Sequence, residues 1–167
     1  MTAVRVSDII QLKVDDDMPK ITSCILTNMC MVCDGTKVLV QDRIDPDWHG
    51  INFPGGHVEH GESFCESVIR EVYEETGLTV ESPRLVGIKN WFKKDGTRYI
   101  VLLFRAEKFS GKLRSSGEGE VYWVEREKLE GMKLAPNFDS MLKVFENDAI
   151  SEMYWSPDTD YSECVFL

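Results

Sequence analysis

The chain has 167 residues, 43% of them hydrophobic and 29% charged, and its formal net charge at pH 7 is −10. This length and composition predict one soluble globular domain, and the negative charge argues against binding a nucleic-acid polymer. The apolar runs are too short to span a membrane, and the N-terminus lacks the basic and apolar segments of a signal peptide. We therefore expect neither a membrane span nor export.

Residues 1–20 show no pattern that separates a strand from a short helix, and we treat them as an N-terminal extension of unclear role. Residues 21–33 are rich in β-branched and apolar side chains, which predicts a strand. The Asp-Gly pair at 34–35 is typical of a hairpin turn, and residues 37–42 are the expected partner strand. A loop is expected over residues 44–51.

The first predicted strand contains Cys30 and Cys33, two of the five cysteines of the chain. Side chains three positions apart on a strand point to opposite faces, so we interpret this C-x-x-C pair as core residues rather than as a redox or metal site. An odd number of cysteines at irregular spacing does not predict a disulfide framework. Free thiols without an export signal indicate a cytoplasmic protein.

A helix is predicted between Ser63 and Gly77. Ser63, with Glu66 three residues later, fits a capping box at the start of a helix, and Gly77 fits the left-handed position after its end. The later part of the chain is expected to form strands over residues 84–92, 97–109 and 120–124 and a helix over residues 138–145. This order of elements predicts an α/β sandwich.

The first helix places Glu71, Glu74 and Glu75 within about 100° of arc on one face. Like charges at this spacing destabilise an isolated helix, so something must offset their repulsion. A divalent cation is the natural candidate, because Mg²⁺ is bound by a few carboxylates together with substrate phosphates.

These glutamates belong to a longer pattern, which consists of Gly56, Glu62, Arg70, Glu71, Val72, Glu74, Glu75, Gly77 and Leu78. The spacing resembles the Nudix box, G-x5-E-x7-R-E-U-x-E-E-x-G-U with U an apolar residue, and every fixed position matches. The resemblance implies a Nudix-type α/β/α sandwich with a mixed β-sheet, which we place at residues 21–148. Residues 149–167 are then an acidic and aromatic C-terminal tail.

The resemblance also implies a metal site. Glu71 and Glu75 would be direct ligands of Mg²⁺, with Mn²⁺ as an alternative, and Glu74 would be a ligand or support one. The Gly55 carbonyl would be a further ligand, because glycine lets the backbone approach closely.

Other residues would prepare the reaction. Arg70 would orient the carboxylates through its pair with Glu74, and Glu62 would tie the loop to the helix; a surface ion pair is the alternative for both. In several Nudix enzymes the general base lies on a loop before a late strand, where this chain has Glu118, with Glu120 as the second choice. Either could instead be a solvated loop acid.

Three residues outside the box are candidates for substrate binding. Arg43 could hold a phosphate or lie on the surface, and Phe53 could line a base pocket or belong to the core. Asn137 could read a purine edge through its amide, but its place before the last helix favours an N-cap. We interpret the three histidines as loop residues, because Mg²⁺ prefers oxygen ligands: His49, His57 and His60.

We therefore expect a MutT-like enzyme that converts 8-oxo-dGTP, or a related nucleoside triphosphate, to the monophosphate and pyrophosphate, as a monomer or homodimer. The box does not choose the substrate, so a pyrophosphatase of ADP-ribose or another nucleoside diphosphate derivative is the alternative. A nucleotide-sensing Nudix module without turnover is the alternative outside enzymology, although such modules usually carry broken boxes.

Overall fold

The computed structural model describes residues 21–46, 48–156 and 163–167, so the extension predicted over residues 1–20 lies outside the described residues. Eight strands of the described chain form one sheet in the order β10-β9-β5-β6-β1-β2-β3, with β8 paired to β2. Their bounds are β1 (Cys24–Asp34), β2 (Lys37–Arg43), β3 (Gly50–Asn52), β5 (Arg84–Phe92), β6 (Arg98–Ala106), β8 (Gly119–Glu125), β9 (Glu152–Trp155) and β10 (Cys164–Phe166).

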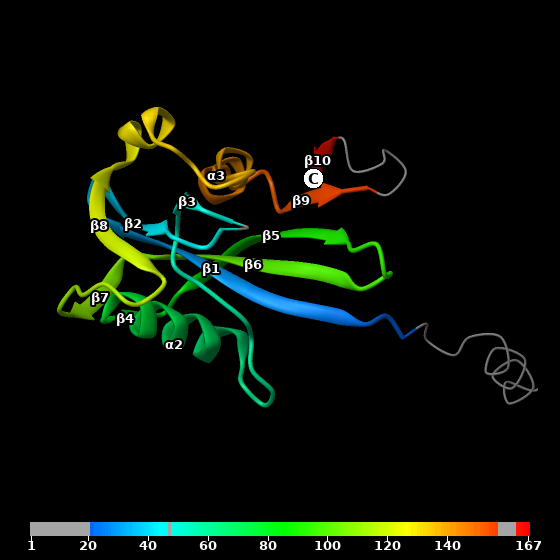
Figure 1. Cartoon of the computed structure of the whole chain (residues 1–167), viewed down its shortest axis with the longest axis horizontal. Coiled ribbons are helices and arrows are strands. Elements are labelled where there is room, and N and C mark those ends of the chain that lie inside the picture. Colours follow the sequence, from blue (N-terminus) through cyan, green and yellow to red (C-terminus); the bar gives the residue numbers. More distant parts are fainter. Residues whose placement is uncertain (1–20, 47, 157–162) are drawn as a thin grey trace, which may run out of the picture.

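The remaining elements are a small β4–β7 ribbon and the helices, namely β4 (Leu78–Glu81), β7 (Lys108–Gly111), α2 (Phe64–Thr76), the 3-10 helix η1 (Arg126–Gly131) and α3 (Phe138–Glu146). In the large sheet β1 runs parallel to β6 and β5 runs parallel to β9, whereas the β1–β2 and β5–β6 pairs are antiparallel. The helices α2 and α3 cover opposite faces of the sheet (Figure 1). The predicted α/β/α sandwich with a mixed sheet is confirmed.

Each face of the sheet has its own hydrophobic core, and the central strand β1 contributes to both. Met31 and Cys33 pack into the core on the α3 side, whereas Cys30 and Val32 pack into the core on the α2 side. This alternation is the reason why β1 reads as an almost continuous apolar run, as strands covered on both faces do. The prediction that Cys30 and Cys33 are core residues is confirmed, and both are free thiols.

Several predicted elements differ from the observed ones. The single strand expected over residues 97–109 is two strands, because β6 ends at Ala106 and β7 leaves the large sheet to pair with β4. The loop expected over residues 44–51 ends in the short strand β3, and the tail adds β9 and β10 to the edge of the sheet. These strands are only three or four residues long, too short for a sequence pattern to reveal.

The helices follow the sequence more closely. Ser63 accepts a hydrogen bond from the backbone N–H of Glu66, and the Glu66 carboxylate accepts one from the N–H of Ser63, which completes the predicted capping box. Gly77 has a φ of 74° at the end of α2, as predicted for a left-handed terminating residue. In the described parts of the chain, no helix combines the length and the apolar composition that crossing a membrane requires.

Candidate active site

Arg70, on the exposed side of α2, connects the helix to the loop before it. Its guanidinium donates two hydrogen bonds to Glu62, at 2.6 and 3.0 Å, and one to the carbonyl of His57 at 3.0 Å. It also bonds Glu71 at 2.9 Å and Glu74 at 3.2 Å. The guanidinium lowers the pKa of Glu62 to about 2, so this carboxylate stays ionised and holds the loop against α2.

The three clustered glutamates lie in different environments. The Glu75 side chain is only 3% exposed, Glu71 is largely buried and Glu74 is exposed. Burial raises the pKa of both Glu71 and Glu75, and the neighbouring Glu118 carboxylate raises that of Glu75 further. Glu75 Oε1 is buried without a hydrogen-bond partner among the described residues. An orphaned buried carboxylate oxygen is costly, which indicates that a ligand belongs there.

Two glycines allow the loop before α2 to approach these carboxylates. The Gly55 N–H donates to Glu75 Oε2 at 2.9 Å. The carbonyls on either side of Gly55 accept hydrogen bonds from β1, one from Cys30 and one from Asn28. A Cβ at Gly56 would lie 2.5 Å from the Glu71 carboxylate, and one at Gly55 would collide with the backbone of Asn28. Only glycine fits at position 55, where the close atoms are backbone, whereas a side chain at position 56 would displace the Glu71 carboxylate.

Glu118 comes from the loop before β8, far from the box in sequence. Its carboxylate forms an ion pair with Arg43 at 3.3 Å, and the Arg43 guanidinium also lies over the Trp48 ring at 5.6 Å. Glu118 and Arg43 line the same cavity as Glu71, whereas Glu120 is not among its lining residues. The structure therefore brings Glu118 and Arg43 to the carboxylate cluster.

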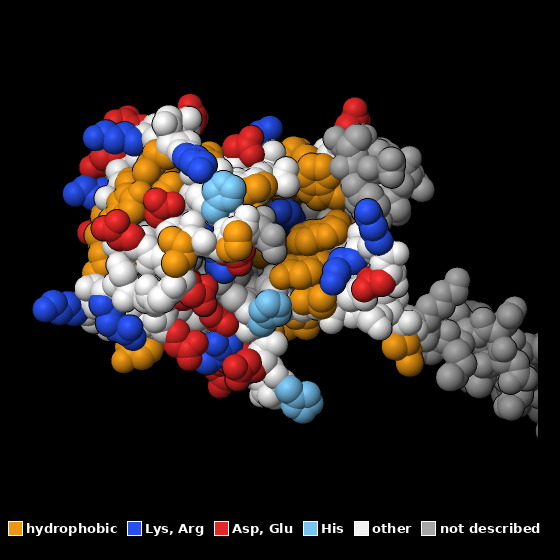
Figure 2. Space-filling view, viewed as in Figure 1, with side chains coloured by type: hydrophobic (Ala, Val, Ile, Leu, Met, Phe, Trp, Pro, Cys, Tyr) orange, Lys and Arg blue, Asp and Glu red, His pale blue; other side chains and the backbone are white. Residues whose placement is uncertain are grey.

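This main cavity has a volume of about 630 Å³ and extends from the carboxylates to the sheet beneath α3. Figure 2 shows acidic side chains gathered over α2 beside a hydrophobic hollow over β5 and β6. The hollow is lined by residues that the sequence analysis did not select, namely Trp48, Lys89, Trp91, Tyr99 and Val101. A signal that could have pointed to this wall is Lys89, a charged residue at an inward position between Ile88 and Asn90 of β5.

Phe53 and Asn137, the other two candidates for substrate binding, lie in different parts of the molecule. Phe53 is fully buried and packs edge-on against Phe138 and Phe145 of α3, so it belongs to the core and does not line the cavity. Of the two places expected for Phe53, the core is confirmed and the substrate pocket is wrong, because the chain turns this ring towards α3. Asn137 occupies the N-cap position of α3, but its side chain makes no capping hydrogen bond, and the residue lines the cavity instead. The predicted N-cap position is confirmed, but the side-chain hydrogen bond expected of an N-cap is absent.

The donor atoms in this site fit a hard divalent cation. Glu71, Glu75 and the Gly55 carbonyl offer oxygen ligands. Among the described residues no cluster of three acidic, histidine or cysteine side chains forms a ready-made cage. The Glu71 carboxylate accepts a hydrogen bond from Arg70, and the Glu75 carboxylate accepts one from the Gly55 N–H. This fits Mg²⁺ or Mn²⁺, which keep several waters and use substrate phosphates as ligands.

Comparison with known proteins agrees with this geometry. The model of the NUDIX domain family matches residues 26–147. The chain belongs to the Nudix hydrolase family. Among curated Nudix proteins, the uncharacterized Nudix hydrolase YvcI of Bacillus subtilis is 30% identical over 135 residues, which cover 75% of this chain and 80% of YvcI. Phosphatase NudJ of Escherichia coli K12 is 31% identical over 85 residues, or 49% of this chain and 54% of NudJ.

Solved Nudix structures share the fold. The MutT mutator protein of Bacillus halodurans superimposes with a TM-score of 0.70 and 28% identity, over 85% of this chain and 97% of that protein. The Nudix domain of Shewanella oneidensis NrtR, solved with ADP ribose, has a TM-score of 0.60 and 16% identity over 81% of this chain and 95% of its own, and supports the fold alone. This chain is a hydrolase of the Nudix class, whose members act on nucleotides and generally use divalent metal ions.

Proposed function

We propose that the protein is a divalent-cation-dependent diphosphatase that converts a nucleoside triphosphate to the monophosphate and pyrophosphate, with 8-oxo-dGTP as the preferred substrate. The observation that carries this proposal is the single cavity that joins the carboxylates at one end to Asn137 at the other. Its volume of about 630 Å³ suits one mononucleotide. Phosphates would lie at the charged end and the base at the apolar end.

Glu71, Glu75 and the Gly55 carbonyl would hold the cation, with Glu74 as a further ligand or a support through Arg70. When bound, Mg²⁺ or Mn²⁺ neutralises phosphate oxygens and lowers the pKa of a coordinated water. Burial favours the protonated form of Glu75, so a cation and an ionised Glu75 stabilise each other.

Glu118 and Arg43 would act on the substrate directly. Glu118 would accept the proton of the attacking water, because its carboxylate lies beside Glu75 yet remains half exposed and reachable. Arg43 would bind a phosphate, and its ion pair at 3.3 Å keeps Glu118 within the cavity until the substrate arrives. Asn137 would pair with the base edge, because its amide makes no cap and offers both a donor and an acceptor.

Steady-state hydrolysis of a nucleotide panel with Mg²⁺ or Mn²⁺ tests this proposal. The expected result is a higher kcat/KM for 8-oxo-dGTP than for dGTP or ADP-ribose, with pyrophosphate as the product. Release of the diphosphate and inorganic phosphate would contradict the proposed cleavage site. Binding without turnover of any nucleotide would favour the sensing module instead.

A second candidate is hydrolysis of ADP-ribose or another nucleoside diphosphate derivative. The observation in its favour is an adjoining cavity of about 650 Å³, which shares Lys89, Trp91 and Asn137 with the main cavity. The two together have room for a second moiety beyond a mononucleotide. Preference for ADP-ribose, with release of AMP and ribose phosphate, would select this candidate and leave the pyrophosphatase chemistry unchanged.

A further inference from the structure

Lys89 lies where the main and adjoining cavities meet. On β5 its side chain shares the α3-facing side with Gly87, which lies against Val144 of α3, and with Trp91. The neighbouring strands place Val101 and Met153 beside it. Lys89 is only 7% exposed, and no ion pair links it to a carboxylate in the described parts of the chain. A buried ammonium without an acid partner is costly unless a ligand compensates it.

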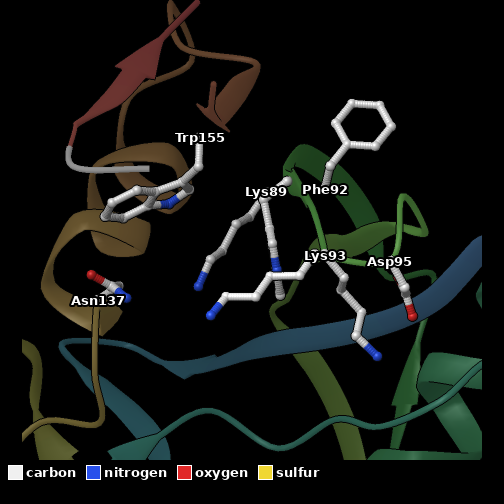
Figure 3. Close-up of a pocket in the computed structure, with 8 residues that line it drawn as sticks. Lys89, Phe92, Lys93, Asp95, Asn137 and Trp155 are labelled. Carbon is white, nitrogen blue, oxygen red and sulfur yellow. The ribbon is translucent and has the colours of Figure 1, made fainter. Parts of the chain in front are cut away.

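The walls around Lys89 are flat and aromatic. Its ammonium lies 5.2 Å from the centre of the Trp91 ring, and that ring stacks on Tyr99 with centroids 4.5 Å apart and an interplanar angle of 15°. Trp155, in register with Trp91 on the parallel strand β9, lines the adjoining cavity. In Figure 3 Lys89, Asn137 and the Trp155 indole surround one space. Aromatic walls of this kind can stack on any base, because every base is planar. A hydrogen-bonding group is then needed to discriminate one base from another.

An ammonium can only donate hydrogen bonds, so it requires an acceptor. Guanine and its oxidised form present a carbonyl oxygen at the position where adenine presents an amino donor. The phosphates of a bound nucleotide have their own partners at the opposite end of the cavity, around Arg43 and the carboxylates. With the phosphates placed there, the base is the group that would reach Lys89.

We propose that Lys89, with Trp91 and Trp155, forms a base-specificity subsite in which the Lys89 ammonium donates to a ring carbonyl oxygen, so that oxo-purines are selected over adenine. This inference rests on the proposed function for its placement of the phosphates. Trp155 lies beyond the segment that matches the family, residues 26–147, so part of the subsite belongs to the C-terminal tail of this chain. Lys89 thus determines specificity from the wall of the cavity.

Equilibrium binding of nucleoside monophosphates, measured by calorimetry without a divalent cation, tests the subsite independently of hydrolysis. The wild-type protein should bind 8-oxo-dGMP and dGMP more tightly than dAMP. Lys89→Met should weaken binding of both oxo-purines about 10- to 100-fold, the range for a lost charge-assisted hydrogen bond, and change dAMP binding less than about threefold. Lys89→Gln keeps an uncharged donor, so its affinity for the oxo-purine monophosphates should lie between those of the wild type and Lys89→Met. This variant also keeps the test possible if Lys89→Met fails to fold.

Lys94→Met is the matched control, because Lys94 is exposed at the rim of the adjoining cavity. It should leave the affinity for all three monophosphates unchanged. Equal losses for all three in Lys89→Met, or a loss in Lys94→Met, would mean that the lysines bind an anion, and the base-reading proposal would fall. Unchanged binding in Lys89→Met, or equal wild-type affinity for dAMP, would also overturn it. If the protein selects oxo-purine monophosphates but hydrolyses no triphosphate, the proposed function fails and the subsite stands.

Discussion

Replacing Lys89 with methionine should stabilise the protein at neutral pH. Burial lowers the pKa of Lys89 from 10.5 to about 8, with only a small opposing effect from the Cys164 thiol. In the unfolded chain the ammonium is hydrated and keeps its ordinary pKa, so folding at pH 7 moves a charge out of water. Methionine has a similar length, adapts to irregular space and carries no charge, so it avoids this cost.

The magnitude follows from the difference between the two pKa values. One pKa unit corresponds to about 1.4 kcal/mol, so the shift from 10.5 to about 8 costs about 3 kcal/mol of unfolding free energy at pH 7. For a protein of this size that corresponds to a melting temperature about 6–12 °C higher in Lys89→Met. The cost is complete below the folded pKa and disappears as the pH rises towards 10.5, since the lysine is then neutral in both states. At pH 10 the buried lysine should lower the free energy of unfolding by less than about 1 kcal/mol.

Urea unfolding of the wild type and Lys89→Met at pH 7 and pH 10 measures this effect. Other groups that titrate in this range are present in both proteins, so their contributions cancel in the difference. Lys94→Met, which removes an exposed ammonium near the same cavity, should show a difference close to zero at both pH values. The reasoning is refuted if Lys89→Met is not the more stable protein at pH 7, or if its advantage is the same at pH 10.

The remaining predictions concern the proposed metal and substrate sites. Glu75→Gln should lower kcat at least about 10²-fold, because a negative ligand is lost, while its metal-free stability relative to the wild type should rise with pH, since burial raises the Glu75 pKa. Mg²⁺ or Mn²⁺ should raise the wild-type melting temperature, and more so at higher pH; a calorimetric scan that shows no shift would contradict the metal site. Glu118→Gln should reduce kcat and leave cation affinity intact, with Glu120→Gln as an unaffected control; normal turnover in Glu118→Gln would move the general base elsewhere. Asn137→Ala should narrow the kcat/KM gap between 8-oxo-dGTP and dGTP, and an unchanged gap would exclude Asn137 from base recognition.

The local features of this protein could be predicted from its sequence because their partners lie within a few residues. The Ser63–Glu66 capping box and the left-handed Gly77 depend on the backbone of one helix and its ends. The Arg70–Glu74 pair joins side chains one helical turn apart, at 3.2 Å. The opposite orientation of Cys30 and Cys33 follows from strand geometry alone.

The parts of the site that depend on contacts between distant segments were harder to predict from the sequence. Glu118 meets Glu75 only because the loop before β8 lies above α2, and the pattern of loop acids could not separate it from Glu120. A buried position alone could not reveal whether Phe53 turns towards the cavity or towards α3.

The base end of the cavity is decided by sheet order. Lys89 reaches it because β5 lies between β6 and β9, and Trp155 reaches it because β9 pairs in parallel with β5 through a register that no local pattern specifies. Lys89 is visible in the sequence as a charged residue within β5. Only the packed structure shows that its ammonium is buried without an acid partner in the described chain and faces an aromatic hollow. Short-range geometry thus sets the carboxylate helix and its chemistry, whereas the selection of the base depends on which strands become neighbours when the sheet assembles.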